Sequence, residues 1–276
     1  MINDQAAALR QMKLEMEKGK ESPEDFLATV PHPCKTIAIT LVLPDEYANE
    51  FPSTIKWLPK VMNRKVKACL WDQAGIASNL VLNSKAGTLR YRMPEKVEIE
   101  NDSLTIRPSQ NDYLQIIKDN QDERVTFLKH IVHDLKQFEE VWISIKSSEL
   151  KKYNSLIQCS DAICIMVPPN ANAVLKCYEA VKSIKTTGYS SPISLLEFTN
   201  LNTSLKQMLG DRIKSVAKNF LGLDLIGSGM VLSNITYEPP KNYSCLGEKI
   251  VEISAKEHDF LYVLSESILY QIPGMI

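Results

Sequence analysis

Six short, continuous apolar runs constrain the fold of this chain more than any other feature. They lie at residues 35–43, 66–71, 141–145, 162–167, 192–198 and 226–232. Between them, the segments 122–140, 171–185 and 203–222 carry apolar residues at helical spacing. Strands without polar alternation are buried on both faces, and strands that alternate with helices form a parallel sheet. The sequence therefore predicts a three-layer α/β fold, with a mainly parallel sheet and helices on both faces.

The rest of the chain divides around this domain, which we assign to residues 35–276. Residues 1–20 predict a short helix that begins at Asn3 and is stopped by Gly19. Residues 21–34 contain three prolines and are interpreted as a linker. Within the domain, residues 96–109 predict a small hairpin around Asn101-Asp102, apart from the parallel strands. Gly222 is expected to end the helix at 203–222.

Charge and composition exclude several classes of protein. The net charge is -1, which provides no overall attraction for nucleic acid or an anionic membrane. No run of about 18 apolar residues occurs and no signal peptide is recognisable, so we expect a cytoplasmic protein without stable membrane insertion. The 6 cysteines lack zinc-ligand spacing and are expected to be reduced core residues. His130, His133 and Asp134 fit an exposed helix face better than a metal site, and no metal is predicted.

The turn after the first predicted strand lacks the features of a nucleotide site. In open α/β sheets, ligands bind outside the carboxyl ends of the strands, and nucleotide sites use a glycine-rich turn there. The segment LVLPDEYANEFP at 41–52 contains no glycine and no lysine, but it does contain Asp45, Glu46 and Glu50. These carboxylates would repel a triphosphate.

Several segments in register nevertheless resemble one family. VKACLWDQAGIASNLVLN at 66–83, FEEVWISI at 138–145 and SDAICIMVPPNANAVLKCYEAVKSI at 160–184 resemble strands and helices of MinD/ParA-type ATPases, which are deviant P-loop proteins. FLGLDL at 220–225 and the opening DQAAALRQM at 4–12 are similar to the flagellar branch, the FlhG (FleN or YlxH) proteins. The resemblance covers nearly the whole chain, and the last two motifs are its most specific part.

The chain departs from that family where the family does its chemistry. By register, residues 41–48 replace the Walker A element Gly-Lys-Gly-Gly-Val-Gly-Lys-Thr/Ser, and Ser144 and Ser148 replace the Walker B aspartate and a following glycine. Asp72 remains near the position where the family activates water. The resemblance therefore implies a pseudo-ATPase that uses no cofactor and has no catalytic residues. The positions of the degenerate nucleotide site are Leu43, Pro44, Asp45, Asp72, Ser144 and Ser148.

By the same resemblance, the N-terminal helix binds an FlhF-like GTPase of the signal-recognition type. The implied partner-binding residues are Asp4, Gln5, Leu9 and Arg10. Gln5 would reach the nucleotide site of the partner, Leu9 would be an apolar anchor and Arg10 a charged contact. The alternative is a solvated, frayed helix that binds nothing.

Two other segments have a structural and a functional interpretation. Near the C-terminus, Leu261, Leu264, Ile268 and Ile272 form an apolar stripe, but no lysine or arginine follows Lys256. We expect this stripe to pack on the domain and not on a membrane. The basic stretch at 56–67 is interpreted as the solvated face of a helix, with contact to nucleic acid as the alternative.

The sequence thus favours a non-hydrolysing, FlhG-like regulator of bacterial flagellar placement, number or assembly. It would act through protein contacts with the FlhF-like GTPase and with other flagellar basal-body or switch proteins, and be recruited to the cell pole or flagellar base. We expect no nucleic-acid partner. The alternatives are an ATP-binding MinD/ParA-type ATPase with an unusual pocket, and a partition-type protein associated with DNA.

Overall fold

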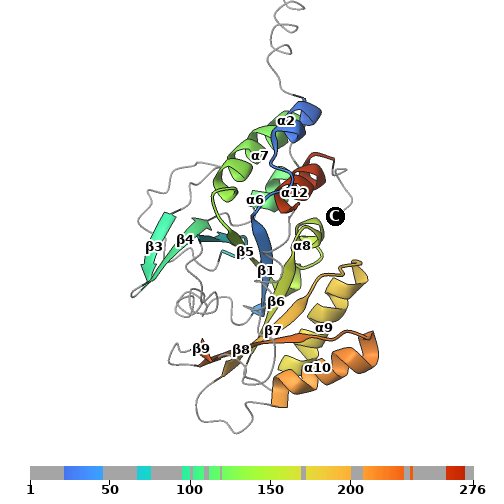
Figure 1. The fold of residues 1–276 in the computed structure, drawn as a ribbon. Coiled ribbons are helices and arrows are strands. Elements are labelled where there is room, and N and C mark those ends of the chain that lie inside the picture. The colour runs from blue at the N-terminus through green and yellow to red at the C-terminus, as the bar shows by residue number, and fades with distance from the viewer. Residues whose placement is uncertain are drawn as a thin grey trace, which may run out of the picture.

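One sheet of nine strands organises the molecule (Figure 1). A computed structural model describes residues 22–45, 67–75, 95–99, 102–108, 112–118, 120–168, 172–199, 208–232, 237–238 and 259–270. The strand order is β3-β4-β2-β5-β1-β6-β7-β8-β9. All neighbours from β4 to β8 are parallel, whereas β3 and β9 pair antiparallel at the two edges. The predicted, mainly parallel sheet is confirmed.

Six of the described strands lie close to the predicted apolar runs, two form the predicted hairpin, and the last was not predicted. They are β1 (Ile37–Leu43), β2 (Ala68–Asp72), β3 (Glu95–Ile99), β4 (Asp102–Pro108), β5 (Glu140–Lys146), β6 (Ala162–Val167), β7 (Ile193–Thr199), β8 (Ile226–Leu232) and β9 (Tyr237–Glu238). Every residue of β1, β2 and β6 is buried. One face, with Ala38, Val42 and Trp71, packs in a core cluster with the described helices. Side chains of the other face, such as Leu41 and Trp142, are equally buried, so the sheet is covered on both sides.

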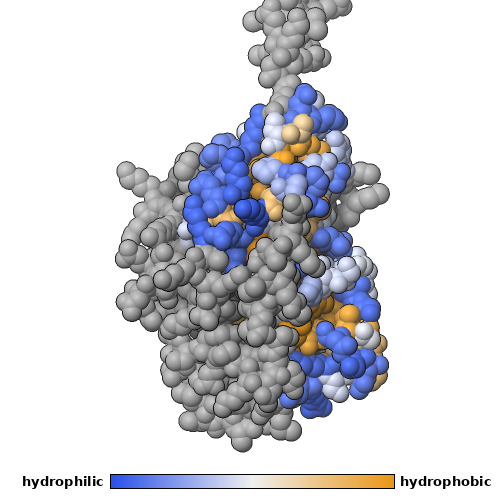
Figure 2. All heavy atoms as spheres, in the orientation of Figure 1, coloured by the Kyte–Doolittle hydropathy of each residue, from blue (hydrophilic) through white to orange (hydrophobic). Residues whose placement is uncertain are grey.

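The described residues form seven α-helices, three of which correspond to the helical segments predicted at 122–140, 171–185 and 203–222. They are α2 (Pro23–Thr29), α6 (Asp112–Ile116), α7 (Gln121–Leu135), α8 (Asn154–Gln158), α9 (Ala173–Thr186), α10 (Met208–Leu221) and α12 (Phe260–Leu269), with the 3-10 helix η2 (Ser147–Glu149). Asn120 caps α7, whose solvent face is hydrophilic (Figure 2). Gly222 follows α10 with a φ of 64°, and its N–H donates to the carbonyl of Lys218. The predicted C-cap is therefore confirmed.

The predicted hairpin exists but belongs to the main sheet. Ile99 pairs with Asp102, so Asp102 lies in β4 and not in the turn. The strand β4 also pairs in parallel with β2, where Leu70 is the partner of Ile106. The hairpin was expected to stand apart, whereas it continues the parallel sheet through β4.

The proline-containing segment at 21–34, interpreted as a linker, includes a helix of the folded core. Ser22 accepts a hydrogen bond from the N–H of Asp25, and the Asp25 carboxylate accepts from Ser22 in return, which is a capping box. Pro23 occupies the first helical turn, where its missing N–H costs nothing. Phe26 and Leu27 are buried against the core. Residues 23–29 therefore belong to the fold, which corrects the linker interpretation for them.

The C-terminal helix α12 packs on the domain as predicted. Leu261, Leu264 and Ile268 are fully buried, whereas Ile272 lies outside the described residues. Arg124 of α7 donates to the carbonyls of Ile268 at 3.1 Å and Leu269 at 3.4 Å, which are the last carbonyls of α12. The same guanidinium donates to the carbonyl of Ile117, just beyond α6. Among the described helices, none has the length and apolar character needed to cross a bilayer.

Candidate functional site

The carboxyl ends of β1, β2 and β5 bring together the positions predicted for a degenerate nucleotide site. In the sheet register, Ser144 of β5 lies opposite both Asp72 of β2 and Leu41 of β1. The chain beyond β1 places Pro44 and Asp45 beside η2, which follows β5. Residues distant in sequence thus form one edge, where a ligand of an α/β sheet is expected.

Asp72 and Ser144 form a buried pair at the centre of this edge. The Ser144 hydroxyl donates to the Asp72 carboxylate at 2.7 Å and accepts from the N–H of Ala74 at 3.2 Å. The exposed fractions are 1% for Asp72 and 0% for Ser144. The hydroxyl uses both its donor and an acceptor site inside the protein, and it provides no charge for a metal ion.

Asp45 lies just beyond β1 and contacts η2. Its carboxylate accepts from the Ser148 hydroxyl at 2.8 Å and lies 3.5 Å from the Ser147 hydroxyl. Leu43 and Pro44 are buried, whereas Asp45 is exposed. An incoming phosphate would meet a carboxylate that already occupies these hydroxyls, which is electrostatically unfavourable. The repulsion predicted for Asp45 has a geometric basis here.

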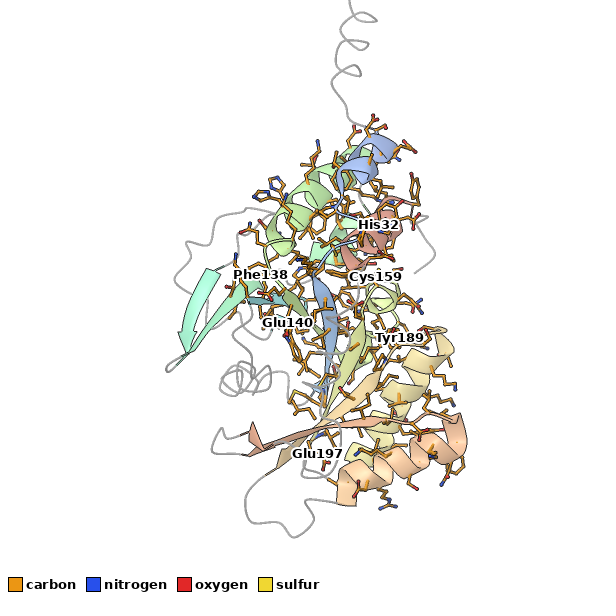
Figure 3. All side chains as sticks on the ribbon, viewed as in Figure 1. His32, Phe138, Glu140, Cys159, Tyr189 and Glu197 are labelled. Carbon is orange, nitrogen blue, oxygen red and sulfur yellow. The ribbon has the colours of Figure 1, made fainter. Side chains whose placement is uncertain are left out.

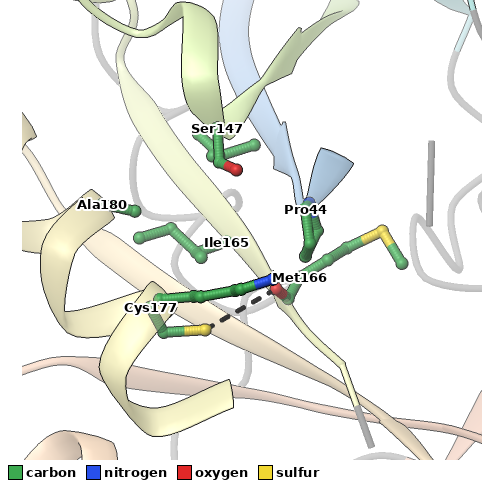
Figure 4. A pocket seen from close by; sticks show the side chains of 8 residues that line it. Pro44, Ser147, Ile165, Met166, Cys177 and Ala180 are labelled. Carbon is green, nitrogen blue, oxygen red and sulfur yellow. Dashed lines mark hydrogen bonds between the residues drawn. The ribbon is translucent and has the colours of Figure 1, made fainter. Parts of the chain in front are cut away.

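A shallow pocket lies beside this loop (Figure 4). It is lined by Val42, Pro44, Ser147, Ile165, Met166, Lys176, Cys177 and Ala180. It is open to solvent and largely apolar. On one side of the pocket, the Cys177 thiol donates to the Met166 carbonyl at 3.8 Å, so both groups have a hydrogen-bond partner within the protein. Lys176 is the one cation among the lining residues.

Glu197, at the carboxyl end of β7, is a site residue that the sequence analysis missed (Figure 3). Burial raises the pKa of its carboxyl group, while the N–H of Gly210 and the ammonium of Lys214 oppose that shift. A Cβ atom at Gly210 would collide with this carboxylate. Glu197 therefore lies against the first turn of α10. In the sequence, Gly210 was the feature that could have indicated a close approach to this turn.

Other predicted site residues stay untested or have structural roles. Asp4, Gln5, Leu9 and Arg10 lie outside the described residues, as do residues 56–66 of the basic stretch. His130 and His133 are exposed on α7, and Asp134 forms an ion pair with buried Arg107 of β4. Within the described part of the chain, no group of three or more His, Cys, Asp or Glu residues is placed to hold a metal ion.

The cysteines that the structure describes are free, and most are buried. Cys69, Cys159, Cys164 and Cys177 are buried and Cys34 is half-buried. Burial raises the pKa of the Cys69 and Cys159 thiols to about 12. A thiol with such a pKa is protonated at neutral pH and is a poor nucleophile. The prediction of core thiols is confirmed for the buried four.

Comparison with known proteins yields similarity in structure alone. No protein-family model matches the chain, and no curated protein matches it by sequence. A plasmid partition protein from Borrelia burgdorferi is 15% identical with a TM-score of 0.48, over 83% of this chain and 96% of that one. MinD cell division protein from Aquifex aeolicus is 12% identical with a TM-score of 0.47, over 86% and 98%. Apo McdA from Cyanothece is 10% identical with a TM-score of 0.49, over 85% and 99%. At these values the likeness carries no conclusion about activity, which has to be judged from the residues of the site.

Proposed function

We propose that this chain is a non-hydrolysing, FlhG-like protein of the MinD/ParA type that regulates flagellar placement, number or assembly through protein contacts. Its N-terminal helix would bind an FlhF-like GTPase, with Gln5 directed to the partner's nucleotide site. The motifs DQAAALRQM and FLGLDL support the subtype. The absence of hydrolysis is inferred from the described edge of the sheet.

The observation that carries the proposal is the pair formed by Asp72 and Ser144. A carboxylate at position 144 would be needed to hold Mg²⁺ through an acidic ligand, and serine is present there. The Asp72 carboxylate is 1% exposed and accepts from Ser144 at 2.7 Å. Asp45 adds negative charge where the γ-phosphate of a bound nucleotide would need donors. These features favour an interaction protein over a hydrolase.

Calorimetric titration of the full chain with ATP and with ADP, each with Mg²⁺, tests the loss of nucleotide chemistry. We expect no saturable heat at millimolar nucleotide. Saturable binding would support the alternative of an ATP-binding protein with an unusual pocket, for which Lys176 beside the pocket is the favourable observation. In that case Lys176→Ala should weaken binding at least tenfold, whereas Lys182→Ala, on the same helix, should not.

GTP hydrolysis by the FlhF-like GTPase of the same cell tests the partner. The wild-type chain is expected to stimulate hydrolysis, while Gln5→Ala and a chain without residues 1–20 are not. Gln11→Ala, in the same segment, is the matched control and should retain stimulation. If none of the four chains stimulates GTP hydrolysis, the proposed N-terminal contact is wrong. The calorimetric result on nucleotide binding does not depend on this outcome.

A further inference from the structure

Charge is segregated between two surfaces of this nearly neutral chain. We define the α2–α12 surface by Glu24 and Asp25 of α2, Glu266 of α12 and its N-cap Asp259. Neither helix contains lysine or arginine, so this surface has a net charge of about -4. The helices α9 and α10 carry six basic residues against two acidic ones, and Asp224, just beyond α10, pairs with Lys218 at 2.8 Å, so the net charge of the α9–α10 surface is about +3. The basic residues are Lys176, Lys182, Lys185, Arg212, Lys214 and Lys218, and the acidic ones are Glu179 and Asp211.

The most exposed large apolar side chains fall on the same two surfaces. Among the described residues they are Leu175 at 60% and Phe220 at 75% on the α9–α10 surface, and Val263 at 36% and Tyr270 at 49% on the α2–α12 surface. Each surface therefore combines a net charge, negative on the α2–α12 surface and positive on the α9–α10 surface, with two exposed apolar groups. Such a combination is typical of protein interfaces, in which apolar contact and charge complementarity act together.

On the α9–α10 surface, the apolar groups are continuous. The ring of Tyr178 meets the ring of Phe220 edge-on, with 6.5 Å between centroids. Leu175 precedes Tyr178 by three residues and Lys182 follows it by four, so both share its helix face. Apolar side chains are visible between hydrophilic ones over α9 and α10 in Figure 2. The strip crosses from one helix to the other and is flanked by lysine.

On the α2–α12 surface, two helices present one face. Asp259, Val263, Glu266 and Tyr270 are spaced by four, three and four residues, and all are exposed. The Tyr270 hydroxyl donates to the Glu24 carboxylate at 3.1 Å, which joins α12 to α2. His32, in turn, pairs with Asp259 at 2.9 Å. The acidic groups are thus held on a continuous, apolar-centred surface.

We propose that the α2–α12 surface of one copy binds the α9–α10 surface of a second copy, head to tail. The occupant is a second copy because both complementary halves lie on this one chain. Pairing of like surfaces is disfavoured, since it would juxtapose charges of the same sign. The two surfaces lie in separate parts of the fold, α2 and α12 at the top of Figure 1 and α9 and α10 at its lower right. One chain can therefore use both, and a contact of this kind extends into filaments or rings.

Sedimentation velocity of the full chain, over a range of concentrations, tests the contact. We expect species that grow with concentration at about 50 mM salt and dissociate at about 500 mM, because screening shortens the reach of surface charge. Two helices a side correspond to a small interface, and the association is expected in the micromolar range. A wild-type chain that remains monomeric at hundreds of micromolar would overturn the proposal.

Paired variants make the test directional. Val263→Lys with Glu266→Lys disables the α2–α12 surface, and Lys182→Glu with Phe220→Asp disables the α9–α10 surface. Each double variant is expected to lose at least tenfold in association constant. In a mixture, the first variant keeps its α9–α10 surface and the second keeps its α2–α12 surface. These two intact surfaces should bind each other and give a 1:1 complex that does not grow further.

The control variant Lys136→Glu with Gln137→Glu places the same change of three charges at exposed positions beyond α7. It should assemble like the wild type, and circular dichroism verifies that all variants are folded. Variants that still assemble alone, or a mixture that stays monomeric, would show that copies meet elsewhere or not at all.

Discussion

Two clusters of buried polar groups, around Arg124 and around Ser144, are both hydrogen-bonded but differ in what the bonds do. Arg124 connects α7 to the end of α12, more than 140 residues away, and to the carbonyl of Ile117 just beyond α6, seven residues away. Ser144 connects two neighbouring strands at the edge where a ligand would bind, through Asp72 and Ala74. In both places, buried polar groups are paired, as burial requires. The first pairing stabilises the packing of three helices, whereas the second withdraws the Asp72 carboxylate from solvent.

Replacing Arg124 by alanine should have the largest effect on stability and tests the first half of this comparison. Arg124 is 4% exposed, and its removal leaves the carbonyls of Ile117, Ile268 and Leu269 without their guanidinium partner. We expect a loss of about 3–4 kcal/mol in the free energy of unfolding, measured with urea. Arg212→Ala, on exposed α10, should change it by less than about 0.5 kcal/mol. Equal effects of the two variants would mean that Arg124 does not hold α12.

The Ser144→Ala variant tests the second half. The Asp72 carboxylate and the Ala74 N–H each lose a buried partner, so we expect a loss of about 2 kcal/mol in the free energy of unfolding. Ser148→Ala removes a hydroxyl from the exposed carboxylate of Asp45 and should cost less than about 0.5 kcal/mol. If Ser144→Ala is as stable as the wild type, water replaces the hydroxyl and the pair is not a structural link.

Glu197 and Gly210 provide a finer comparison at the same edge of the sheet. Alanine in place of a helical glycine normally stabilises by about 1 kcal/mol. At position 210 this gain should be offset, because the new Cβ displaces the Glu197 carboxylate. In a Glu197→Ala background, Gly210→Ala should again raise the free energy of unfolding by about 1 kcal/mol. A double-mutant cycle, with stability measured by thermal or urea unfolding, gives this difference. An unchanged gain in both backgrounds would mean that the two residues do not meet.

The smallest effect concerns pH. Because burial raises the pKa of Glu197 in the folded state, the unfolded chain releases this proton at a lower pH than the folded chain does. Its stabilising contribution is present below the unfolded pKa and is lost as the pH rises through the folded pKa. The stability of wild type relative to Glu197→Gln should therefore fall as the pH rises from below 4.5, the ordinary value, to just above it. A difference that rises with pH over this range would contradict the assignment.

Local patterns predicted the sheet, and long-range pairing limited the prediction of the site. Continuous apolar runs identified the strands because burial on both faces leaves no room for polar alternation. Pro23 suggested a break, although Ser22 and Asp25 form a capping box that makes it the start of a helix. The bond between Ser144 and Asp72 joins residues 72 positions apart, and those of Arg124 reach 144 and 145 positions along the chain. No local pattern encodes such partners, because they depend on the register of parallel strands and on helix packing.

The central strand β1 sets how two binding events on this molecule can communicate. The chain enters β1 after α2, which is part of the α2–α12 surface, and leaves it at Leu43, beside Asp45 and the pocket. The first and last residues of this seven-residue strand are about 20 Å apart. A partner bound at the α2–α12 surface and a ligand bound beside the pocket would therefore occupy opposite ends of this strand. Their binding free energies should add, with a coupling term near zero unless the strand itself has two positions.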